Sequence, residues 1–305
     1  MKQFNLVIVH MSGEQDIDDW RRVASLVEGQ APEIDVRIAD NNFRNLLLMD
    51  WQATRPSLVF SASILRKFRP RTGIVYSGRR VSKWDEIERF RAAGVRTPMT
   101  VLWTGGQSYP PEIWGEHVIA KPMRGLKGQG IQLLPTARLD ELWKPVTAGG
   151  NRPFMLQKFI DTGRRPSHFR VLTSFGIPLY MSRRWAGRAT GDQPRAPQDP
   201  EWRLVTNSSE DLEIVSDEAV LAFAREMAGA MPEVPVLGCD IARDVRDGEL
   251  YALEANSFGQ TWHFSSDTHR ALKKRMGREL DYYSQFGALD LLAAELVRRV
   301  RAEAR

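Results

Sequence analysis

The sequence predicts an α/β (α+β) protein in which a small N-terminal α/β domain precedes two α+β lobes. Three observations lead to this fold class: strand and helix periodicities alternate at the start of the chain, a glycine-rich strand-loop-strand follows them, and a pair of strands carrying acidic side chains comes near the end. We expect an N-terminal domain at 1–80, a small lobe at 81–160 and a large lobe at 161–305.

The N-terminal domain opens as β-α-β, because two apolar, strand-like runs flank a segment with helical spacing and an acidic first turn. Its expected elements are a strand at Phe4–Val9, a helix at Asp16–Glu28, a strand at Ile34–Ala39, a helix around Arg44–Trp51, and strands at Ser57–Ser61 and Gly73–Tyr76. No glycine fingerprint follows the first strand, which excludes a dinucleotide site of the usual kind.

The small lobe begins with a helix at Lys83–Ala93, which Ser82 caps and Gly94 ends. A linker with Pro98 separates this helix from the strands that follow. The remaining expected elements are strands at Met99–Trp103, His117–Lys121, Ile131–Leu134 and Phe154–Phe159, with a helix near Leu139–Trp143.

The large lobe starts with a predicted hairpin, Phe169–Phe175 and Pro178–Arg183, which turns at Gly176. The long segment Ala186–Trp202 has no period and is rich in Gly, Pro, Arg and Asp, so we expect a loop that is either mobile or functional. The remaining expected elements are a helix at Asp217–Met231, strands at Val236–Ala242 and Glu249–Ala255, and a C-terminal helix at Ala288–Arg301 with one apolar stripe.

The composition is that of a soluble globular protein, since 42% of the 305 residues are hydrophobic and 27% are charged. No apolar run is long enough to cross a bilayer, and Met1–Val9 is too short for a secretory signal, so we expect a cytoplasmic protein without membrane contact. The single cysteine, Cys239, cannot form an internal disulfide, and its apolar neighbours argue against a nucleophile.

The formal net charge of +5 favours anionic partners, of which nucleic acid and nucleotide phosphate are the two considered. Basic residues cluster at Arg270–Arg278 and Arg298–Arg305, but aromatic residues do not alternate with them as they would in a stacking platform. Nucleic acid is therefore the less favoured partner, and a homo-oligomer stays open.

A lysine followed by a glycine-rich loop forms the first candidate site. Lys121 ends an apolar strand, and Gly125, Gly128 and Gly130 follow it before the next strand begins. Glycines let backbone N–H groups approach phosphate oxygens, and the lysine adds a point charge. Because a strand follows the loop, it is neither a Walker loop nor a dinucleotide fingerprint. A glycine-rich hairpin turn is the alternative interpretation.

Three side chains with oxygen donors form the second candidate site. Asp240 lies on one predicted strand, and Glu254 and Asn256 lie two residues apart on the next, so the latter two point to the same face. Carboxylate and amide oxygens suit Mg²⁺, which also takes phosphate oxygens and water. Exposed acids near a turn are the alternative, although the apolar sequence around each strand favours burial and therefore a partner.

In this order the motifs resemble those of the ATP-grasp superfamily, over roughly Val81–Phe258. The resemblance rests on the following segments: Ser82-Lys83-Trp84-Asp85, Ala93-Gly94-Val95-Arg96-Thr97-Pro98, Lys121 with its loop, Leu156-Gln157-Lys158-Phe159-Ile160, Gly238-Cys239-Asp240-Ile241, and Leu253-Glu254-Ala255-Asn256-Ser257-Phe258. His168-Phe169-Arg170-Val171 and Met181-Ser182-Arg183-Arg184 are similar to segments of the amino-acid ligases that include glutamate ligases acting on a ribosomal protein. The implied fold has two α+β lobes that grip ATP.

The resemblance implies roles on the nucleotide side of the site. Lys83 and Lys121 would hold the phosphates of ATP beneath the loop at 125–130, with Lys83 alternatively only a surface lysine in a first helical turn. The adenine would contact residues at the end of a strand, through one side chain and the backbone after it: Gln157, Lys158, Phe159 and Ile160.

The resemblance also implies a metal site and a cationic site. Asp240, Glu254 and Asn256 would hold one or two Mg²⁺ ions, or Mn²⁺ in their place. Arg183 is the first candidate to face the transferring phosphoryl group, and Arg170 and Arg184 are further candidates for that catalytic role. For these last two, a structural ion pair is the alternative.

The sequence departs from the subgroup at positions that bear on the acceptor. His168 replaces an acidic residue, the segment after the arginine pair lacks the usual asparagine and Gly-Gly, and Ser257 and its successors replace a proline-glycine segment. His263 either contacts substrate or is structural. The identities of the acid and the amine, the number of residues added and the oligomeric state therefore stay open.

The implied activity is that of a carboxylate-amine ligase, which joins a small-molecule or peptide carboxylate to an amine through an acyl phosphate. No arrangement of the Ser-His-Asp or Cys-His type is evident that would supply a side-chain nucleophile instead. One alternative is an ATP-binding regulatory or scaffolding module of the same fold without ligase turnover. A nucleic-acid-binding protein, suggested only by the net charge, is a third hypothesis.

Overall fold

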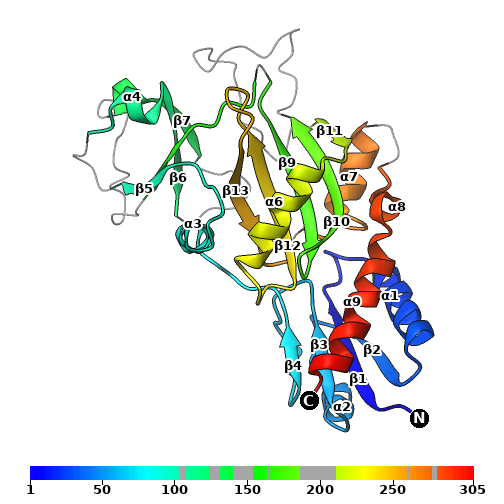
Figure 1. Ribbon diagram of the computed structural model, residues 1–305. Helices are drawn as coiled ribbons and strands as arrows, with labels where there is room; N and C mark the ends of the chain where they lie inside the picture. Colours follow the sequence, from blue (N-terminus) through cyan, green and yellow to red (C-terminus); the bar gives the residue numbers. More distant parts are fainter. Residues whose placement is uncertain are drawn as a thin grey trace.

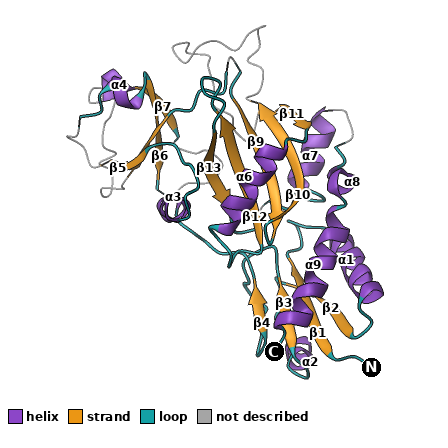
Figure 2. Cartoon of the chain, viewed as in Figure 1, coloured by secondary structure: helices purple, strands orange, loops and turns teal. Residues whose placement is uncertain are grey.

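A computed structural model describes residues 1–103, 108–123, 131–139, 154–163, 165–185, 211–259, 261–276 and 280–305. The described strands form three sheets, and Figures 1 and 2 show them arranged along an elongated molecule with the N-terminal sheet at one end. No helix in these ranges is both long and apolar enough to cross a membrane.

The N-terminal sheet is parallel, with the strand order β2-β1-β3-β4. Its strands are β1 (Phe4–His10), β2 (Ile34–Asp40), β3 (Ser57–Phe60) and β4 (Ile74–Tyr76), and its helices are α1 (Ile17–Gln30) and α2 (Leu46–Gln52). Asp16 caps α1 by accepting the N–H of Asp18, which satisfies one of the free donors at the helix start. The predicted β-α-β opening is therefore present, with boundaries shifted by one or two residues.

The second sheet has four antiparallel strands in the order β5-β8-β6-β7. Its elements are β5 (Thr100–Trp103), α4 (Pro111–Trp114), β6 (His117–Pro122), β7 (Gln132–Pro135), the short 3-10 helix η1 (Thr136–Arg138) and β8 (Phe154–Lys158). A small core of apolar side chains, including Trp103 and Trp114, lies on one face. Except for Leu139, the helix predicted near 139–143 lies outside the described residues.

The third sheet has five antiparallel strands in the order β11-β10-β9-β12-β13. Its strands are β9 (Ser167–Ser174), β10 (Ile177–Trp185), β11 (Asp211–Ile214), β12 (Val236–Arg243) and β13 (Leu250–Asn256). The turn between β9 and β10 uses Phe175 and Gly176, both with positive φ, as a two-residue hairpin turn of matching twist requires. The predicted hairpin at this position is therefore present.

Two helices cover one face of the five-stranded sheet. Apolar residues of α6 (Glu218–Gly229) and of α3 (Lys83–Ala92) pack in one core with the side chains of β9 and β12 that point to that face. Ser82 caps α3 as predicted, since its hydroxyl accepts the N–H of Asp85 at 3.1 Å. The expected small lobe, 81–160, includes α3, yet the core contacts of this helix are with the five-stranded sheet. The domain boundaries after residues 80 and 160 stay a prediction.

The C-terminal helix α9 (Ala288–Glu303) returns to the N-terminal sheet and packs beside α1 (Figure 1). Its apolar stripe joins a core that combines side chains of β1, β3 and α1 with side chains of β9, β10, β11 and β12 from the five-stranded sheet. The short helices α7 (Asp267–Met276) and α8 (Tyr282–Phe286), like β11 and α4, were not predicted, because they are short or mostly polar and show no clear apolar period.

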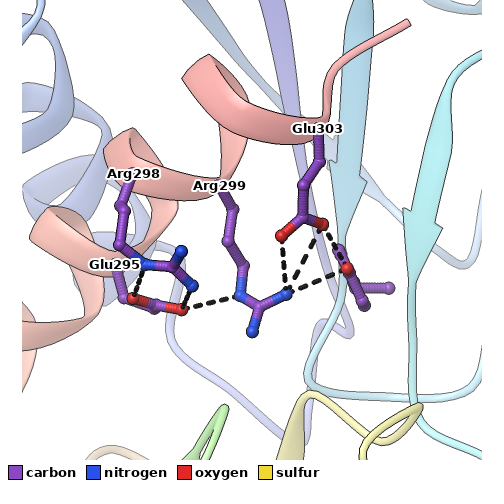
Figure 3. A network of polar contacts seen from close by, with 5 residues as sticks. Glu295, Arg298, Arg299 and Glu303 are labelled. Carbon is purple, nitrogen blue, oxygen red and sulfur yellow. Dashed lines mark hydrogen bonds and ion pairs between the residues drawn. The ribbon is translucent and has the colours of Figure 1, made fainter.

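The arginines near the C-terminus are bound within the protein. Figure 3 shows Arg298 and Arg299 paired with Glu295, and Arg299 also paired with Glu303. Arg301 pairs with Glu33 of the N-terminal domain. These three guanidinium groups already have carboxylate partners, so the part of the predicted basic cluster that they form is an ion-pair network.

Arg299 links three parts of the fold. Its guanidinium binds Glu295 and Glu303 on its own helix, donates to the hydroxyl of Tyr76 on β4 at 2.9 Å, and lies 3.9 Å from the ring centre of Phe175 in the β9–β10 turn. Burial, with the hydrogen bond to Glu303, raises the pKa of Tyr76, so the phenol stays neutral. Arg299 therefore ties the N-terminal sheet and the large sheet to one helix.

We expect Arg299→Ala to lower the free energy of unfolding by about 1–3 kcal/mol, because it leaves the partly buried Glu303 without its cation and removes one of the two arginines that bind Glu295. The matched control is Arg301→Ala, an exposed arginine on the same helix, whose ion pair should contribute about 1 kcal/mol or less. Thermal unfolding of the two variants beside the wild type measures the difference. Equal midpoints for the two variants would contradict the linking role of Arg299.

Candidate functional site

The candidate site lies on the face of the five-stranded sheet opposite α6. On this face the register aligns side chains from neighbouring strands: Asp240 on β12 is opposite Arg170 on β9 and Glu254 on β13. Asn256 is opposite Gly238, one pleat further along, so it points to the same face. The predicted metal-site residues are therefore brought together by strand pairing.

Strand β13 is the edge of the sheet nearest α3 and the four-stranded sheet (Figure 1). The register shifts between Asp240 and Ile241, which leaves Leu253 without an opposite residue on β12. A bulge of this kind bends the strand and turns its side chains and carbonyls in new directions. The carbonyl of Leu253 is consequently available to Lys121, whose Nζ lies 3.5 Å away.

The two predicted phosphate lysines meet at β13 from different elements. Lys83, the first residue of α3, places Nζ 3.5 Å from Oε1 of Glu254, and Lys121 comes from the end of β6. Burial lowers the pKa of Lys121 to about 8, while the charge of Glu254 acts in the opposite direction. Two cations and one carboxylate thus share a small volume that a phosphate and a divalent cation could occupy.

Glu86 joins this cluster and was not predicted. Its side chain is only 5% exposed, and Oε2 accepts the backbone N–H of Ala255 at 3.2 Å. Burial and then the charge of Glu254 raise the pKa of Glu86 to about 8. The sequence contains one feature that could have identified Glu86 as part of the site. Glu86 is three residues after Lys83 and so shares its helix face, beside apolar Ile87 and Phe90.

Asp240 is fully engaged by neighbouring side chains. Arg170 donates to both of its oxygens, with Nη2 at 2.8 Å from Oδ2, and Nε2 of His168 lies 3.5 Å from Oδ1. The side-chain amide of Asn256 donates to Oδ2 at 3.1 Å. Burial opposes ionisation, but the charges of Arg170 and His168 hold the pKa of Asp240 below its usual value. Asp240 is therefore a carboxylate with a fixed cationic partner.

The donor set fits a divalent cation in part. Glu254 supplies a carboxylate that Lys83 contacts at 3.5 Å, and the amide nitrogen of Asn256 donates to Asp240, so the Asn256 group that could bind a cation is its carbonyl oxygen. Hard oxygen donors of this kind suit Mg²⁺. Among the described residues no group of three or more His, Cys, Asp or Glu side chains could hold a metal ion, so the amide of Asn256 is needed to complete the set.

The structure places Arg183, the first candidate for the cationic role, on the face of the sheet opposite Asp240. Arg183 pairs with Phe169 in the register and lies 5.5 Å from its ring, on the face that packs against α6. Its neighbour Arg184 pairs with His168 and so shares the face of Arg170 and Asp240. The reason is a register shift between Pro178 and Tyr180, because a bulge reverses which residues of a strand face each side.

Three histidines lie on or near the site face. His168 contacts Asp240, as described above. His263 is buried with Nδ1 3.2 Å from the hydroxyl of Ser266, and its pKa falls well below the usual value through burial, then through the charges of Arg184 and Arg170. The ring of His269 is 5.2 Å from that of Tyr282. A neutral His263 adds no charge of its own beside the two arginines.

The segment predicted to contact adenine ends β8. The side chain of Gln157 is 2% exposed and donates to the hydroxyl of Thr100 at 3.1 Å, so its nitrogen is used inside the small sheet. The N–H groups of Lys158 and Phe159 bind the carbonyls of Met99 and His117. Ile160 is buried. The Gln157 nitrogen and these two backbone N–H groups are therefore bound within the protein.

The glycine-rich loop, the long loop and Cys239 are the remaining predicted features. Gly125, Gly128 and Gly130 lie outside the described residues, as do residues 186–202 of the long loop. Cys239 is buried in β12, and burial raises the pKa of its thiol, which agrees with the expectation that it is not a nucleophile.

Comparison with known proteins gives structural matches only. No protein-family model matches the chain, and no curated protein matches its sequence. The ATP-grasp ligase PsnB in complex with minimal precursor, Mg and ADP has a TM-score of 0.56 at 14% identity, over 97% of this chain and 97% of that chain. The complex of PsnB with precursor peptide PsnA2 and AMPPNP has a TM-score of 0.50 at 15% identity, over 97% and 98%.

The D-cycloserine synthetase DcsG is similar as well, with a TM-score of 0.54 at 13% identity, over 97% of this chain and 99% of that chain. Likeness at this level of identity, extending over nearly the whole of both chains, establishes architecture. It confirms the fold expected from the motifs. The chain has the ATP-grasp fold.

Proposed function

We propose that this chain is an ATP- and Mg²⁺-dependent carboxylate-amine ligase. The observation that carries the proposal is the meeting of two lysines from separate elements with the oxygens of Glu254 and Asn256 at one strand edge. Structurally similar proteins support it, because PsnB is a ligase described with Mg, ADP and a precursor peptide. Small molecules or peptides that carry a carboxylate and an amine are the substrate class, and a cytoplasmic location goes with this activity.

In the proposed reaction an oxygen of the substrate carboxylate attacks the γ-phosphorus of ATP, and the bond from that phosphorus to the β–γ bridging oxygen breaks, with ADP as the leaving group. The amine nitrogen then attacks the acyl carbon of the acyl phosphate, phosphate leaves, and the nitrogen gives up a proton to form the amide. No side-chain nucleophile is needed. The protein contributes binding, orientation and charge.

The residues have distinct tasks in this proposal. Lys83 and Lys121 bind phosphate oxygens, and Glu254 and Asn256 are the first ligands for Mg²⁺, which when bound would offset phosphate charge. Arg184, together with Arg170, faces the charge on the transferring phosphoryl group. Gln157 to Ile160 border the adenine, through backbone groups and apolar side chains.

One observation favours the alternative of a nucleotide-binding module without turnover. Asp240, the third expected metal ligand, has both oxygens bound by Arg170. If that pair persists in the nucleotide complex, Asp240 holds no cation. Release of ADP on addition of an acid and an amine separates the two functions, since a binding module gives none.

Thermal unfolding with ATP and Mg²⁺, compared with Mg²⁺ alone, tests the nucleotide site first. We expect ATP to raise the midpoint in a Mg²⁺-dependent way, and Glu254→Ala combined with Asn256→Ala to abolish the effect. The matched control is Glu213→Ala, an exposed glutamate on β11 of the same sheet, which should respond like the wild type. No shift for the wild type at saturating ATP would rule out the proposed nucleotide site.

The affinity for ATP with Mg²⁺ should fall as the pH rises through about 8, because Lys121 loses the proton that makes it a cation in that range. The loss should approach about tenfold per pH unit if the ammonium is required. Lys121→Arg keeps its charge at all these pH values, so it should show only the change that ionisation of the neighbouring Glu86 causes in the same range. Calorimetric titration from pH 7 to about 9.5 measures both proteins, and parallel profiles would contradict this role for Lys121.

The two adjacent arginines provide a direct test of the face assignment. Arg184→Ala should lower the rate of ADP release by about 100-fold or more, as expected for loss of a cation at the transferring group. Arg183→Ala, one residue away on the opposite face, should stay within about threefold of the wild type. The assay uses the acid–amine pair found by screening. A reversed order of the two variants would return the role to Arg183.

A further inference from the structure

Helix α3 presents two titratable side chains to the same strand. Lys83 and Glu86 are three residues apart and lie on one helix face, with Ile87 and Phe90 continuing that face into the buried core. Lys83 reaches the carboxylate of Glu254, and Glu86 reaches the backbone of the next residue, Ala255. The helix therefore contacts β13 at the point where the proposed metal ligands lie.

Strand β13 needs such contacts because it is an edge strand with a bulge. None of the strands in the described part of the chain pairs with its outer edge. Two of its outward N–H groups bind other parts of the chain instead: Ala252 N–H donates to the carbonyl of Arg96, and Ala255 N–H donates to Glu86. These two anchors lie on either side of Leu253, the residue left unpaired by the bulge.

Among the described residues, three contacts join residues 253–255 to elements outside the five-stranded sheet, and two of them involve the phosphate lysines. Lys121 binds the carbonyl of Leu253, Lys83 pairs with Glu254, and Glu86 binds the N–H of Ala255. In the proposed function both lysines bind phosphate oxygens. Their contacts with Leu253 and Glu254 would therefore break when the nucleotide binds. The Glu86 bond is the one of the three that does not compete with nucleotide.

We propose that Glu86 is a positioning residue, which holds β13 through the N–H of Ala255 so that the flanking Glu254 and Asn256 keep their oxygens directed at the cation. This inference rests on the proposed function. Glu86 itself is not a ligand in it, since its carboxylate is directed at the strand backbone. The role requires an oxygen acceptor at this position.

The test is calorimetric titration of the full-length protein with the ATP analogue AMPPNP, with Mg²⁺ and with EDTA in its place. Glu86→Ala should raise the dissociation constant with Mg²⁺ by about tenfold or more, as loss of a group that orients metal ligands does. Without Mg²⁺ its affinity should stay within about threefold of the wild type. Glu86→Gln retains an oxygen acceptor and should restore the Mg²⁺-dependent affinity.

Glu88→Ala is the matched control, because Glu88 is an exposed carboxylate on the same helix that pairs with Arg91. If Glu86→Ala does not fold, Glu86→Met takes its place, since methionine fills the space without an oxygen acceptor. Equal weakening with and without Mg²⁺, or a Glu86→Gln variant as weak as Glu86→Ala, would overturn the positioning role. Wild-type protein that binds no nucleotide would instead overturn the proposed function, and this inference with it.

Discussion

Burial of one face of the five-stranded sheet against α6 and α3 is the constraint on which the site depends. Because that face must carry the apolar side chains of β9, β12 and their neighbours, the register of each strand is fixed. The opposite face then carries Arg170, Asp240 and Glu254 in one row across three strands. Packing on one side of the sheet therefore determines the chemistry available on the other.

Charge pairing stabilises this arrangement without nucleotide. Buried cations and carboxylates are costly unless they are paired, and each has a partner: Lys83 with Glu254, and Arg170 with Asp240. A nucleotide with a divalent cation carries both signs of charge. Its phosphate can therefore take the place of Glu254 beside Lys83, and its cation can take the place of Lys83 beside Glu254. The second pair is more tightly bound, with two hydrogen bonds from the Arg170 guanidinium to Asp240. If this pair breaks when nucleotide binds, Asp240 can hold a cation as a ligase requires; if it persists, the chain fits a simple nucleotide-binding module.

The N-terminal domain is joined to the site through the segment that follows β13. Asp19 of α1 accepts hydrogen bonds from Trp262, Ser265 and Tyr283, and Trp262 also packs 4.4 Å from the ring of Trp20. Gly238 lets this segment approach β12, since a Cβ there would lie 2.6 Å from the Thr261 side chain. The segment that carries His263 is therefore packed between the N-terminal domain and β12.

Local periodicity, capping and short spacings in the sequence are enough to predict the α/β class, most element positions, the Ser82 cap and the β9–β10 hairpin. They also make Lys121, Glu254 and Asn256 candidate site residues, whereas Lys83 is a candidate through the resemblance to ATP-grasp proteins. The tertiary structure decided the rest. Without the bulge at Leu179, Arg183 would pair opposite His168 and face the site; with it, Arg184 does. The partners of Asp240 and Glu86 are likewise 70 and 169 residues away in the chain, and contacts at that separation are set by packing, which no local pattern encodes.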